Sequence, residues 1–580
     1  MNTDQVRVAT VQFEPKQFEK KHNVLELMGL VRQAASTGSK LIVTPEMGTT
    51  GYCWYTREEV APYVETIPGP TTEQFAELAK EFETHIVVGL PEIDPATGLY
   101  YNSAVLIGPE GVIGKHRKTH SYISEPKWSA PGDLGHEVFE TSIGRIALLI
   151  CMDIHFIETA RLVALAEADI ICHISNWLAE RTPAPYWISR AFENDCYLIE
   201  SNRWGLERTV QFSGGSCVIS PEGKIETVID TGDGIGYAEI DLKNARLRKR
   251  GPQGPLRDRR PDCYHELAQN SYLWNPLDFF GLYGYEPLPP GRKSRIAVGQ
   301  FSPTNHYEDN LAKIESAIKT SQAQGGADLL VFPELSLSGP FTSSENAQAI
   351  SGPAVTALTG LAIRHRIYLA AGFVEQDDQN KRYNTLVLVG PAGLTGSYRK
   401  IHLDPSDKRW ATAGNQWKTF DLPIGRIGLL IGYDAIFPES TRILALRGCD
   451  VVLCAGAQAT PAPSPHAGSK IRQNYPIPTA ADPYHWHHYR VRAGENNVYF
   501  AFSNPIDQEK GCFGLSGVFG PDTFSFPRHE AIVNTEEGVA ILEIDTTNLA
   551  SGYPTNVVRR KDLVAMRQPI QYQGLLSAHD

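Results

Sequence analysis

The chain has 580 residues, of which 42% are hydrophobic and 21% charged, and 66 acidic against 54 basic side chains give a formal net charge of −12. These values are typical of a soluble globular protein and exclude a disordered or fibrous chain. At roughly 150 residues per domain, the length predicts two to four domains. The excess of acidic side chains provides no positive electrostatic potential that would attract nucleic acid, so we expect a small-molecule partner instead.

The predicted elements of the first half alternate between strands and helices. Short apolar runs of strand character are followed along the chain by segments with helical spacing of apolar residues. The expected strands lie at 7–13, 40–46, 84–92, 102–109 and 145–153. Between them, the spacing of apolar residues predicts helices over 24–35 and 71–82. This alternation indicates a layered α/β domain.

The second half of the chain repeats the first. RVATVQFEP begins at residue 7 and RIAVGQFSP at residue 295, and the same displacement of 288 separates Glu46 from Glu334. Lys118 and Lys400 differ by 282, IGRIALLICMD (from 143) and IGRIGLLIGYD (from 424) by 281, and RAFENDCYLIESN (from 190) and RAGENNVYFAFSN (from 492) by 302. The change from 281 to 302 indicates an insertion of about 21 residues within 461–489. Units of this size are duplicated domains, because solenoid repeats run only ~20–50 residues.

The repeat predicts how the chain is divided. We expect a catalytic domain at 6–285, a linker at 286–294 and a second domain of the same kind at 295–570. The segment EPLPPGRKS at 286–294 contains three prolines and a glycine, a composition that suits an exposed connection between domains.

Three short blocks of the first half place a carboxylate, an amine and a thiol in order along the chain. TPEMGTTGY contains Glu46, HRKTH contains Lys118 and ICMDIHFIETAR contains Cys151. Each block lies at the end of a predicted strand, where α/β folds present reactive groups. Breaking an unactivated carbon–nitrogen bond needs a nucleophile, a base that returns its proton to the leaving nitrogen, and a donor to the developing oxyanion. These three residues can fill those roles.

With these blocks, and with NRWG at 202–205, FSGGS at 212–216 and RDRRPDCY at 257–264, the first half resembles the nitrilase superfamily of carbon–nitrogen hydrolases. The resemblance covers almost the whole of 6–265. It implies two αββα sandwich domains in tandem and a Glu–Lys–Cys catalytic set that uses no metal or organic cofactor. It also implies that Glu125, seven residues before Gly132, is a further active-site carboxylate that orients the substrate and the lysine.

The expected mechanism passes through a thioester. Glu46 takes the proton of Cys151, and the thiolate attacks the carbonyl carbon while Lys118 and the backbone N–H of Met152 hold the oxyanion. Glu46 then protonates the departing amine and activates water. Taken alone, Cys151 would be a small buried core residue, Glu46 a strand-end cap and Lys118 a solvated charge. The order of the three, with matching flanks, favours catalysis.

The second half lacks the nucleophile. Glu334 and Lys400 are retained, but Gly432 stands opposite Cys151, and a glycine cannot form a thioester. Asp407 replaces the second carboxylate. We therefore interpret this half as a catalytically inactive copy. Because members of the resembled family pair their sandwiches, we expect the two halves to pack as an internal pseudo-dimer. Assembly of several copies of the chain into a homo-oligomer is a further possibility.

The residues after the nucleophile bear on the substrate. In the resembled family, nitrilases proper usually follow the cysteine with Trp-Glu, whereas amidases and carbamoylases carry another residue and then Asp. The sequence Cys151-Met152-Asp153 therefore favours an amide or N-carbamoyl substrate. Two alternatives stay open: a nitrilase that releases acid and ammonia, and a non-catalytic binding or scaffold protein. The residues expected to line the pocket are Trp54, His155, Asn176 and Trp177. Trp54 could equally be a buried core residue.

Two histidine- and glycine-rich segments suggest sites that we do not favour. HWHH at 485–488 has no cysteine or aspartate at metal-ligand spacing, so we expect a solvated or interface loop. SGGS at 213–216 predicts a turn and not a phosphate-binding loop.

The cysteines and the N-terminal segment indicate the compartment. Nine cysteines are few for this length, odd in number and without a C-x-x-C pair, which favours a reducing environment. The polar start runs into the strand-like VRVATVQF at 6–13, so we expect no signal peptide. No apolar run approaches the ~18 residues of a membrane-spanning helix. We expect a cytoplasmic protein that is not bound to a membrane.

Overall fold

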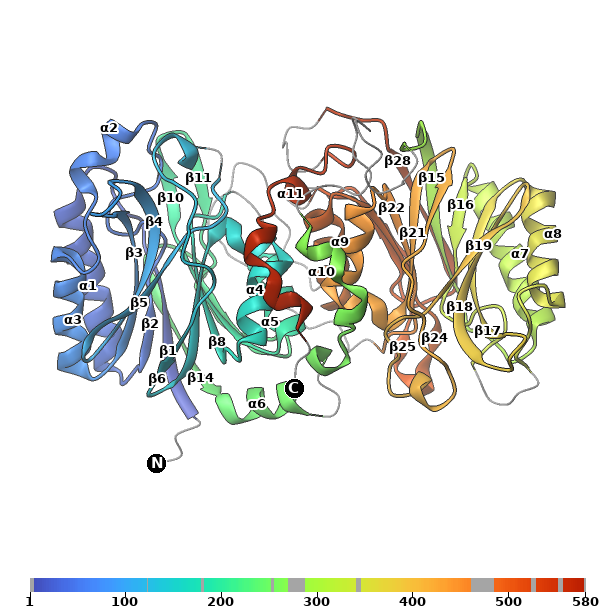
Figure 1. Ribbon diagram of the computed structural model, residues 1–580, viewed down its shortest axis with the longest axis horizontal. Coiled ribbons are helices and arrows are strands. Elements are labelled where there is room, and N and C mark those ends of the chain that lie inside the picture. The colour runs from blue at the N-terminus through green and yellow to red at the C-terminus, as the bar shows by residue number, and fades with distance from the viewer. Residues whose placement is uncertain are drawn as a thin grey trace. The chain divides into compact units, whose positions relative to one another are not determined.

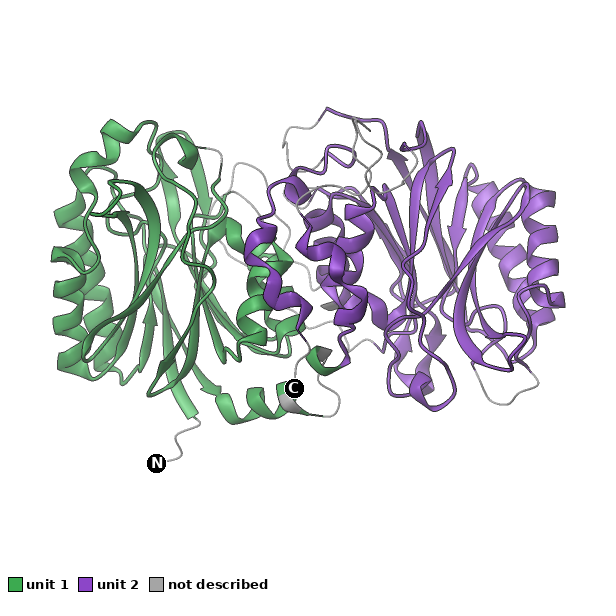
Figure 2. Ribbon diagram, in the orientation of Figure 1, with its two compact units in different colours: residues 1–257, 465–481, 579 green, residues 258–464, 482–578, 580 purple. Residues whose placement is uncertain are grey.

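The computed structural model describes residues 5–122, 124–178, 182–251, 255–269, 287–340, 346–459, 484–522, 528–550 and 557–577. These residues form two compact units, coloured separately in Figure 2. The first contains the described residues up to 257 and the second contains those from 258 onward. Each unit is an αββα sandwich, as the resemblance implied (Figure 1).

The first unit contains two six-stranded sheets of mixed direction. In spatial order, the first sheet contains β14 (Gly234–Asp241), β1 (Gln5–Gln12), β2 (Leu41–Val43), β3 (His85–Ile93), β4 (Tyr100–Gly108) and β5 (Gly111–Arg117). The second contains β13 (Ile225–Val228), β12 (Cys217–Ile219), β9 (Tyr197–Asn202), β8 (Ile170–Ser175), β7 (Gly144–Ile150) and β6 (Val138–Thr141). The sheets contact each other through β1 with β9 and β4 with β7. The hairpin β10 (Trp204–Glu207) and β11 (Val210–Ser213) forms a separate pair.

Helices cover the outer face of each sheet. α1 (Lys20–Ser36) and α3 (Pro70–Phe82) pack on the first sheet, and α4 (Ile157–Leu165) and α5 (Pro185–Asn194) pack on the second. α2 (Arg57–Val60) and α6 (Leu242–Arg250) are the other α-helices described in this unit. Because each sheet is covered on both faces, its central strands are apolar almost throughout, which explains the continuous runs in the sequence.

The predicted apolar face of the first helix is confirmed. Val24, Leu27, Val31 and Ala35 are buried against the first sheet, and Met28 is partly buried at the edge of the same cluster. Burying side chains of this size contributes roughly 1.5–3 kcal/mol each, so this face accounts for much of the attachment of α1 to the sheet.

The second unit repeats the architecture. One sheet contains β19 (Gly393–Arg399), β18 (Arg382–Gly390), β17 (Tyr368–Gln376), β16 (Leu329–Val331), β15 (Lys293–Gln300) and β28 (Gly538–Asp545). The other contains β20 (Thr419–Leu422), β21 (Gly425–Ile431), β22 (Val451–Ala455), β23 (Tyr499–Ser503), β26 (Gly517–Phe519) and β27 (Glu530–Ile532). β24 (Ile506–Asp507) and β25 (Cys512–Phe513) form a short hairpin.

The helices of the second unit also follow the first. α7 (Tyr307–Ala323) and α8 (Pro353–His365) pack on the sheet that contains β15, and α9 (Pro438–Leu446) and α10 (Tyr484–Asn496) lie on the other sheet. The short helix α11 (Asp562–Ala565) contacts both α9 and α10. Across the described residues of both units, no helix is both long and apolar enough to cross a bilayer.

Residues 258–269 pack within the second unit, whereas the repeat predicted a first domain that extends to 285. Arg259 Nε donates to Glu439 Oε1 at 2.9 Å, and both side chains are buried. The indole of Trp417 donates to the carbonyl of Cys263 at 2.8 Å. Repetition in the sequence shows which segments are homologous, but it does not show against which unit a connecting tail packs.

The prediction for the HWHH segment is wrong. His485, His487 and His488 lie in α10 and are buried. His485 Nε2 lies 2.9 Å from the carbonyl oxygen of Leu515, and His488 Nε2 lies 2.9 Å from that of Ala435. The segment is therefore part of the helical layer of the second unit and not a solvated loop. The part of the insertion at 461–483 lies outside the described residues.

Candidate active site

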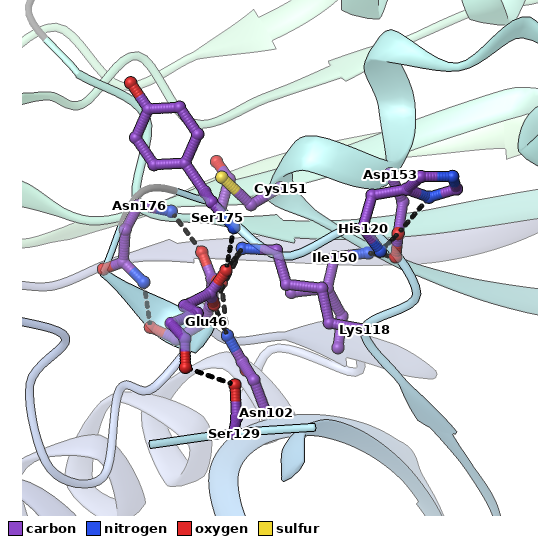
Figure 3. A network of polar contacts seen from close by, with 12 residues as sticks. Glu46, Asn102, Lys118, His120, Ser129, Ile150, Cys151, Asp153, Ser175 and Asn176 are labelled. Carbon is purple, nitrogen blue, oxygen red and sulfur yellow. Dashed lines mark hydrogen bonds and ion pairs between the residues drawn. The ribbon is translucent and has the colours of Figure 1, made fainter. Parts of the chain in front are cut away.

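The sheet ends of the first unit present the predicted catalytic residues. Glu46 follows β2, Lys118 directly follows β5, and Cys151 directly follows β7 and begins the 3-10 helix η3 (Cys151–His155). Figure 3 shows their side chains converging between the two sheets, together with Asn102 from β4. The strand ends therefore bring the three blocks together, as expected.

Lys118 and Asn102 connect the two glutamates. Lys118 Nζ donates to Glu46 and to Glu125, at 2.9 Å in each case. Asn102 Nδ2 donates to the same two carboxylates, at 2.6 Å in each case. All four side chains are buried. Glu125, the first residue of the short helix η2 (Glu125–Lys127), is thus part of the same cluster.

Asn176 holds the other side of Glu46. Its backbone N–H donates to Glu46 Oε2 at 2.8 Å, and its side-chain amide donates to the Glu46 carbonyl at 3.0 Å. Glu46 thereby accepts hydrogen bonds on both carboxylate oxygens, which fixes its orientation toward the nucleophile. The sequence predicted Asn176 as a substrate contact, and the structure places it against the expected base.

Cys151 stands on a bend that few residues adopt. Its φ is 45°, in the left-handed region that is uncommon for residues with a side chain, and its carbonyl oxygen lies 3.0 Å from His173 Nε2. Backbone conformations of this kind persist only where the surroundings hold them, and they concentrate at functional sites. The turn points the thiol into the cluster of charged groups (Figure 3).

The charges of the cluster act on one another. Burial raises the pKa of the Cys151 thiol well above its usual value, the charge of Glu46 raises it further, and Lys118 offsets only part of this. Burial also raises the pKa of Glu125, to about 7, against the opposing effect of Lys118. Burial alone would lower the pKa of Lys118, but the thiolate form of Cys151 and the two carboxylates raise it well above the usual range. The cluster thus disfavours the thiolate of Cys151, and its carboxylates favour the ammonium form of Lys118.

Asp153 links the lysine segment to the nucleophile segment. Its buried carboxylate accepts hydrogen bonds from the backbone of Thr119 and His120, at 3.1 and 3.0 Å, and from the Ile150 N–H at 3.1 Å. His116 Nε2 lies 2.9 Å from the same carboxylate. Although burial opposes it, hydrogen bonding by the two histidines holds the pKa of Asp153 well below its usual range. One charged group therefore fixes Lys118 relative to Cys151.

The remaining predicted pocket residues fall into two groups. His155 and Trp177 stack with ring centroids 4.8 Å apart, close to η3. Trp54 is completely buried, and its indole packs against Phe18 at 5.3 Å and Tyr63 at 5.1 Å. The structure thus places Trp54 in the core, the second of the two readings that its sequence context left open.

The second unit preserves the cluster without the nucleophile. Lys400 Nζ donates to Glu334 at 2.8 Å and to Asp407 at 2.6 Å, and Asn384 donates to Glu334 at 2.6 Å. Gly432 keeps the left-handed backbone of its counterpart, with φ of 40°. The bend therefore survives although the thiol does not.

A third carboxylate, Asp404, joins this second cluster. It accepts from Lys400 Nζ at 2.9 Å. Glu334, Asp404 and Asp407 each offer an oxygen within 4.8 Å of the others, a spacing that could suit a cation. The ammonium of Lys400 already contacts all three and takes that role.

A family model and several known proteins match this chain. The carbon–nitrogen hydrolase family model matches residues 7–250 and 295–551, so the chain belongs to that family, within the nitrilase superfamily, and carries its domain twice. A nitrilase from Pyrococcus abyssi is 37% identical over 262 residues, which cover 45% of this chain and 99% of the relative. An omega-amidase from Homo sapiens is 29% identical over 274 residues, covering 44% and 96%. A solved carbon–nitrogen hydrolase from Helicobacter pylori G27 is 27% identical, with a TM-score of 0.43, covering 46% and 99%.

The sequence missed two residues of the site. Asn102 is a polar residue inside an apolar strand, and the second half repeats it as Asn384 within matching YNS and YNT segments. From the sequence, Asp153 is informative only about the substrate class, although it recurs as Asp434. Each of these polar residues lies in an apolar segment and is present in both copies. A buried polar residue must find hydrogen-bond partners, so this pattern could have assigned both residues to the site.

Proposed function

We propose that the first unit hydrolyses the carbon–nitrogen bond of a small amide or N-carbamoyl substrate through a thioester on Cys151. The observation that carries this proposal is the shared contact of Lys118 with Glu46 and Glu125, in a buried cluster beside a cysteine on a strained turn. Membership of the carbon–nitrogen hydrolase family supports the reaction class.

In the first step, Glu46 takes the thiol proton as the sulfur attacks the carbonyl carbon. Because the pKa of Cys151 is raised by burial, the proton leaves together with carbon–sulfur bond formation rather than beforehand. Negative charge moves to the carbonyl oxygen. Lys118, which stays protonated, and the backbone N–H of Met152 stabilise that charge.

In the second step, the proton on Glu46 passes to the leaving nitrogen, and ammonia or an amine departs. Glu46 then removes a proton from water, which attacks the thioester and releases the acid and the free thiol. Glu125 orients Lys118 and the substrate throughout. Asn176 keeps Glu46 in place, and His155 with Trp177 is proposed to face the acyl group.

The residues that follow the nucleophile favour an amide over a nitrile. In the resembled family, nitrilases proper usually carry Trp-Glu after the cysteine, whereas Cys151 is followed by Met152 and Asp153. Asp153 also accepts a hydrogen bond from the lysine segment. A nitrilase is the second candidate, because the Pyrococcus abyssi relative at 37% identity carries that name. A binding protein is the third, since Gly432 shows that this chain has lost a nucleophile once; the intact set of the first unit argues against it.

We further propose that the inactive unit serves as the pairing partner of the active one, in an internal pseudo-dimer. The duplication supports this. Residues 1–285 expressed alone should lose stable activity, and full, stable activity of that fragment would contradict the pairing role.

The experiment for the reaction class is release of ammonia or amine from three substrate panels: primary amides, N-carbamoyl compounds and nitriles. The wild-type chain should turn over members of the first or second panel, and Cys151→Ala should abolish that turnover. Turnover of nitriles only would favour the second candidate. If no panel gives turnover that depends on Cys151, the hydrolase proposal fails.

A further inference from the structure

The second unit contains a cavity of about 580 Å³ at its degenerate site. Glu334, Asp404 and Asp407 form its acidic part, and Leu335, Pro340 and Trp410 are among its apolar lining. The unit therefore keeps a small-molecule-sized space although position 432 carries no cysteine.

The hydrogen bonds of this acidic part leave one oxygen open. Glu334 Oε1 accepts from Lys400 and Asn384, at 2.8 and 2.6 Å. Asp404 Oδ2 and Asp407 Oδ2 accept from Lys400, at 2.9 and 2.6 Å. Within the described parts of the chain, no group donates to Glu334 Oε2, although the side chain is only 6% exposed. Glu334 lines the cavity, so a ligand or water there can donate to this open oxygen.

The corresponding oxygen of the first unit, Glu46 Oε2, has a donor. It accepts from the backbone N–H of Asn176 at 2.8 Å. Ala457 follows Asn176 by 281 residues, the displacement that also relates Gly432 to Cys151, and it lines the cavity. Glu334 Oε2 instead points at Gly432. A Cβ atom at position 432 would lie less than 3.0 Å from this oxygen, which is closer than two such atoms can approach. Loss of the cysteine side chain thus leaves room for this carboxylate to face the cavity.

We propose that this cavity binds a small primary amine in its ammonium form, with the ammonium donating to Glu334 Oε2. Three carboxylates against the single ammonium of Lys400 leave the inner end of the cavity net negative, which favours a cation over an anion. Lys400 already occupies the point shared by the three carboxylates, so a metal ion would have to displace it. An organic ammonium needs only the open oxygen.

The rest of the lining fits an alkyl chain. Leu335, Pro340 and Trp410 offer apolar contacts. Lys510 also lines the cavity but pairs with Asp507 at 2.9 Å, so these two charges offset each other. Arg409 is exposed to solvent, where its charge is screened. Burial raises the pKa of Glu334 to about 7, so an arriving ammonium would also favour the charged form of that carboxyl.

Binding is tested by titrating the full wild-type chain with n-butylamine in a calorimeter at pH 8. n-Butanol, tetramethylammonium and Mg²⁺ are titrated separately, because none of them is an amide substrate or an acid product of the first unit. The amine should bind saturably and more tightly than the other three probes. Absence of amine binding, or tighter binding of n-butanol, tetramethylammonium or Mg²⁺, would overturn the proposal.

Variants locate the site. Glu334→Gln should weaken amine binding roughly tenfold or more, as expected for loss of a charge-assisted hydrogen bond. Asp378→Asn, at an exposed position of the same unit, removes the same charge and should bind as wild type. Gly432→Ala crowds Glu334 Oε2 and should also weaken amine binding, so it tests the site if Glu334→Gln does not fold.

Cys151→Ala should leave amine binding unchanged, because that residue belongs to the first unit. Since the assay measures binding without turnover, it does not depend on the proposed hydrolase activity. Binding that disappears with Cys151→Ala, or that persists in both Glu334→Gln and Gly432→Ala, would show that the amine binds elsewhere.

Discussion

Glu334 Oε2 occupies space that a side chain at Gly432 would need, since a Cβ atom there would approach it to well under 3.0 Å. The second unit has therefore adapted around the lost nucleophile. The substitution Gly432→Cys in a Cys151→Ala background should not restore turnover, because the new thiol would collide with the base that must activate it. Ammonia release by the double variant, compared with Cys151→Ala alone, measures this. Recovery of turnover would show that Glu334 moves aside freely.

Asn102 is predicted to be a positioning residue for both glutamates, through its bonds of 2.6 Å. Removing a buried hydrogen bond to a charged group costs about 1.5–3 kcal/mol, so Asn102→Ala should lower kcat roughly 10- to 100-fold. Asn244→Ala, at an exposed site on α6, is the control and should keep wild-type kinetics. An effect of Asn102→Ala confined to KM would contradict the positioning role.

Glu125 should make stability depend on pH. Its pKa rises from the usual value near 4.5 when unfolded to about 7 when folded, because it is buried. Between these values the folded state binds the additional proton, so this residue destabilises the fold as pH rises from 5 to 8. Relative to wild type, Tm of Glu125→Gln should therefore improve over that range. Glu77→Gln, on the exposed face of α3, should track wild type at every pH. A constant Tm difference for Glu125→Gln would contradict this account.

Asp153 should affect both folding and catalysis. Asp153→Asn removes the charge that holds the lysine segment to the nucleophile segment, so both Tm and kcat should fall. Asp434 makes the corresponding contacts in the second unit, accepting from the His402 N–H and the Tyr398 hydroxyl, at 2.8 Å in each case. Asp434→Asn should lower Tm similarly but reduce kcat much less. Equal losses of kcat would mean that Asp153 acts only through global stability.

The sequence predicted the cluster of Glu46, Lys118 and Cys151, because each residue follows an apolar strand and strand ends meet at a sheet edge. The αββα sandwich fold and the place of Glu125 in the site were what the resemblance to the nitrilase superfamily implied. The sequence also identified Gly432, since a duplicated chain provides its own comparison. It did not identify Asn102 or Asp153 as parts of the site. Their roles depend on which buried partners they meet, and hydropathy patterns do not carry that information.

Packing between elements explains the remaining differences. The HWHH segment contains three polar-looking side chains, yet α10 buries all three histidines against neighbouring segments such as that around Leu515. Trp54 lies near Glu46 in sequence but points into an aromatic cluster with Phe18 and Tyr63. In each case the tertiary neighbours, which come from distant parts of the chain, decided the environment.

The reaction proposed for the first unit requires Cys151 to carry the acyl group. Peptide mass spectrometry detects this group when the wild-type chain is quenched with acid during turnover of its best amide or N-carbamoyl substrate. We expect a thioester adduct of the acyl mass on the peptide that contains Cys151, and no adduct in Cys151→Ala. An adduct on another residue, or continued turnover by Cys151→Ala, would contradict it.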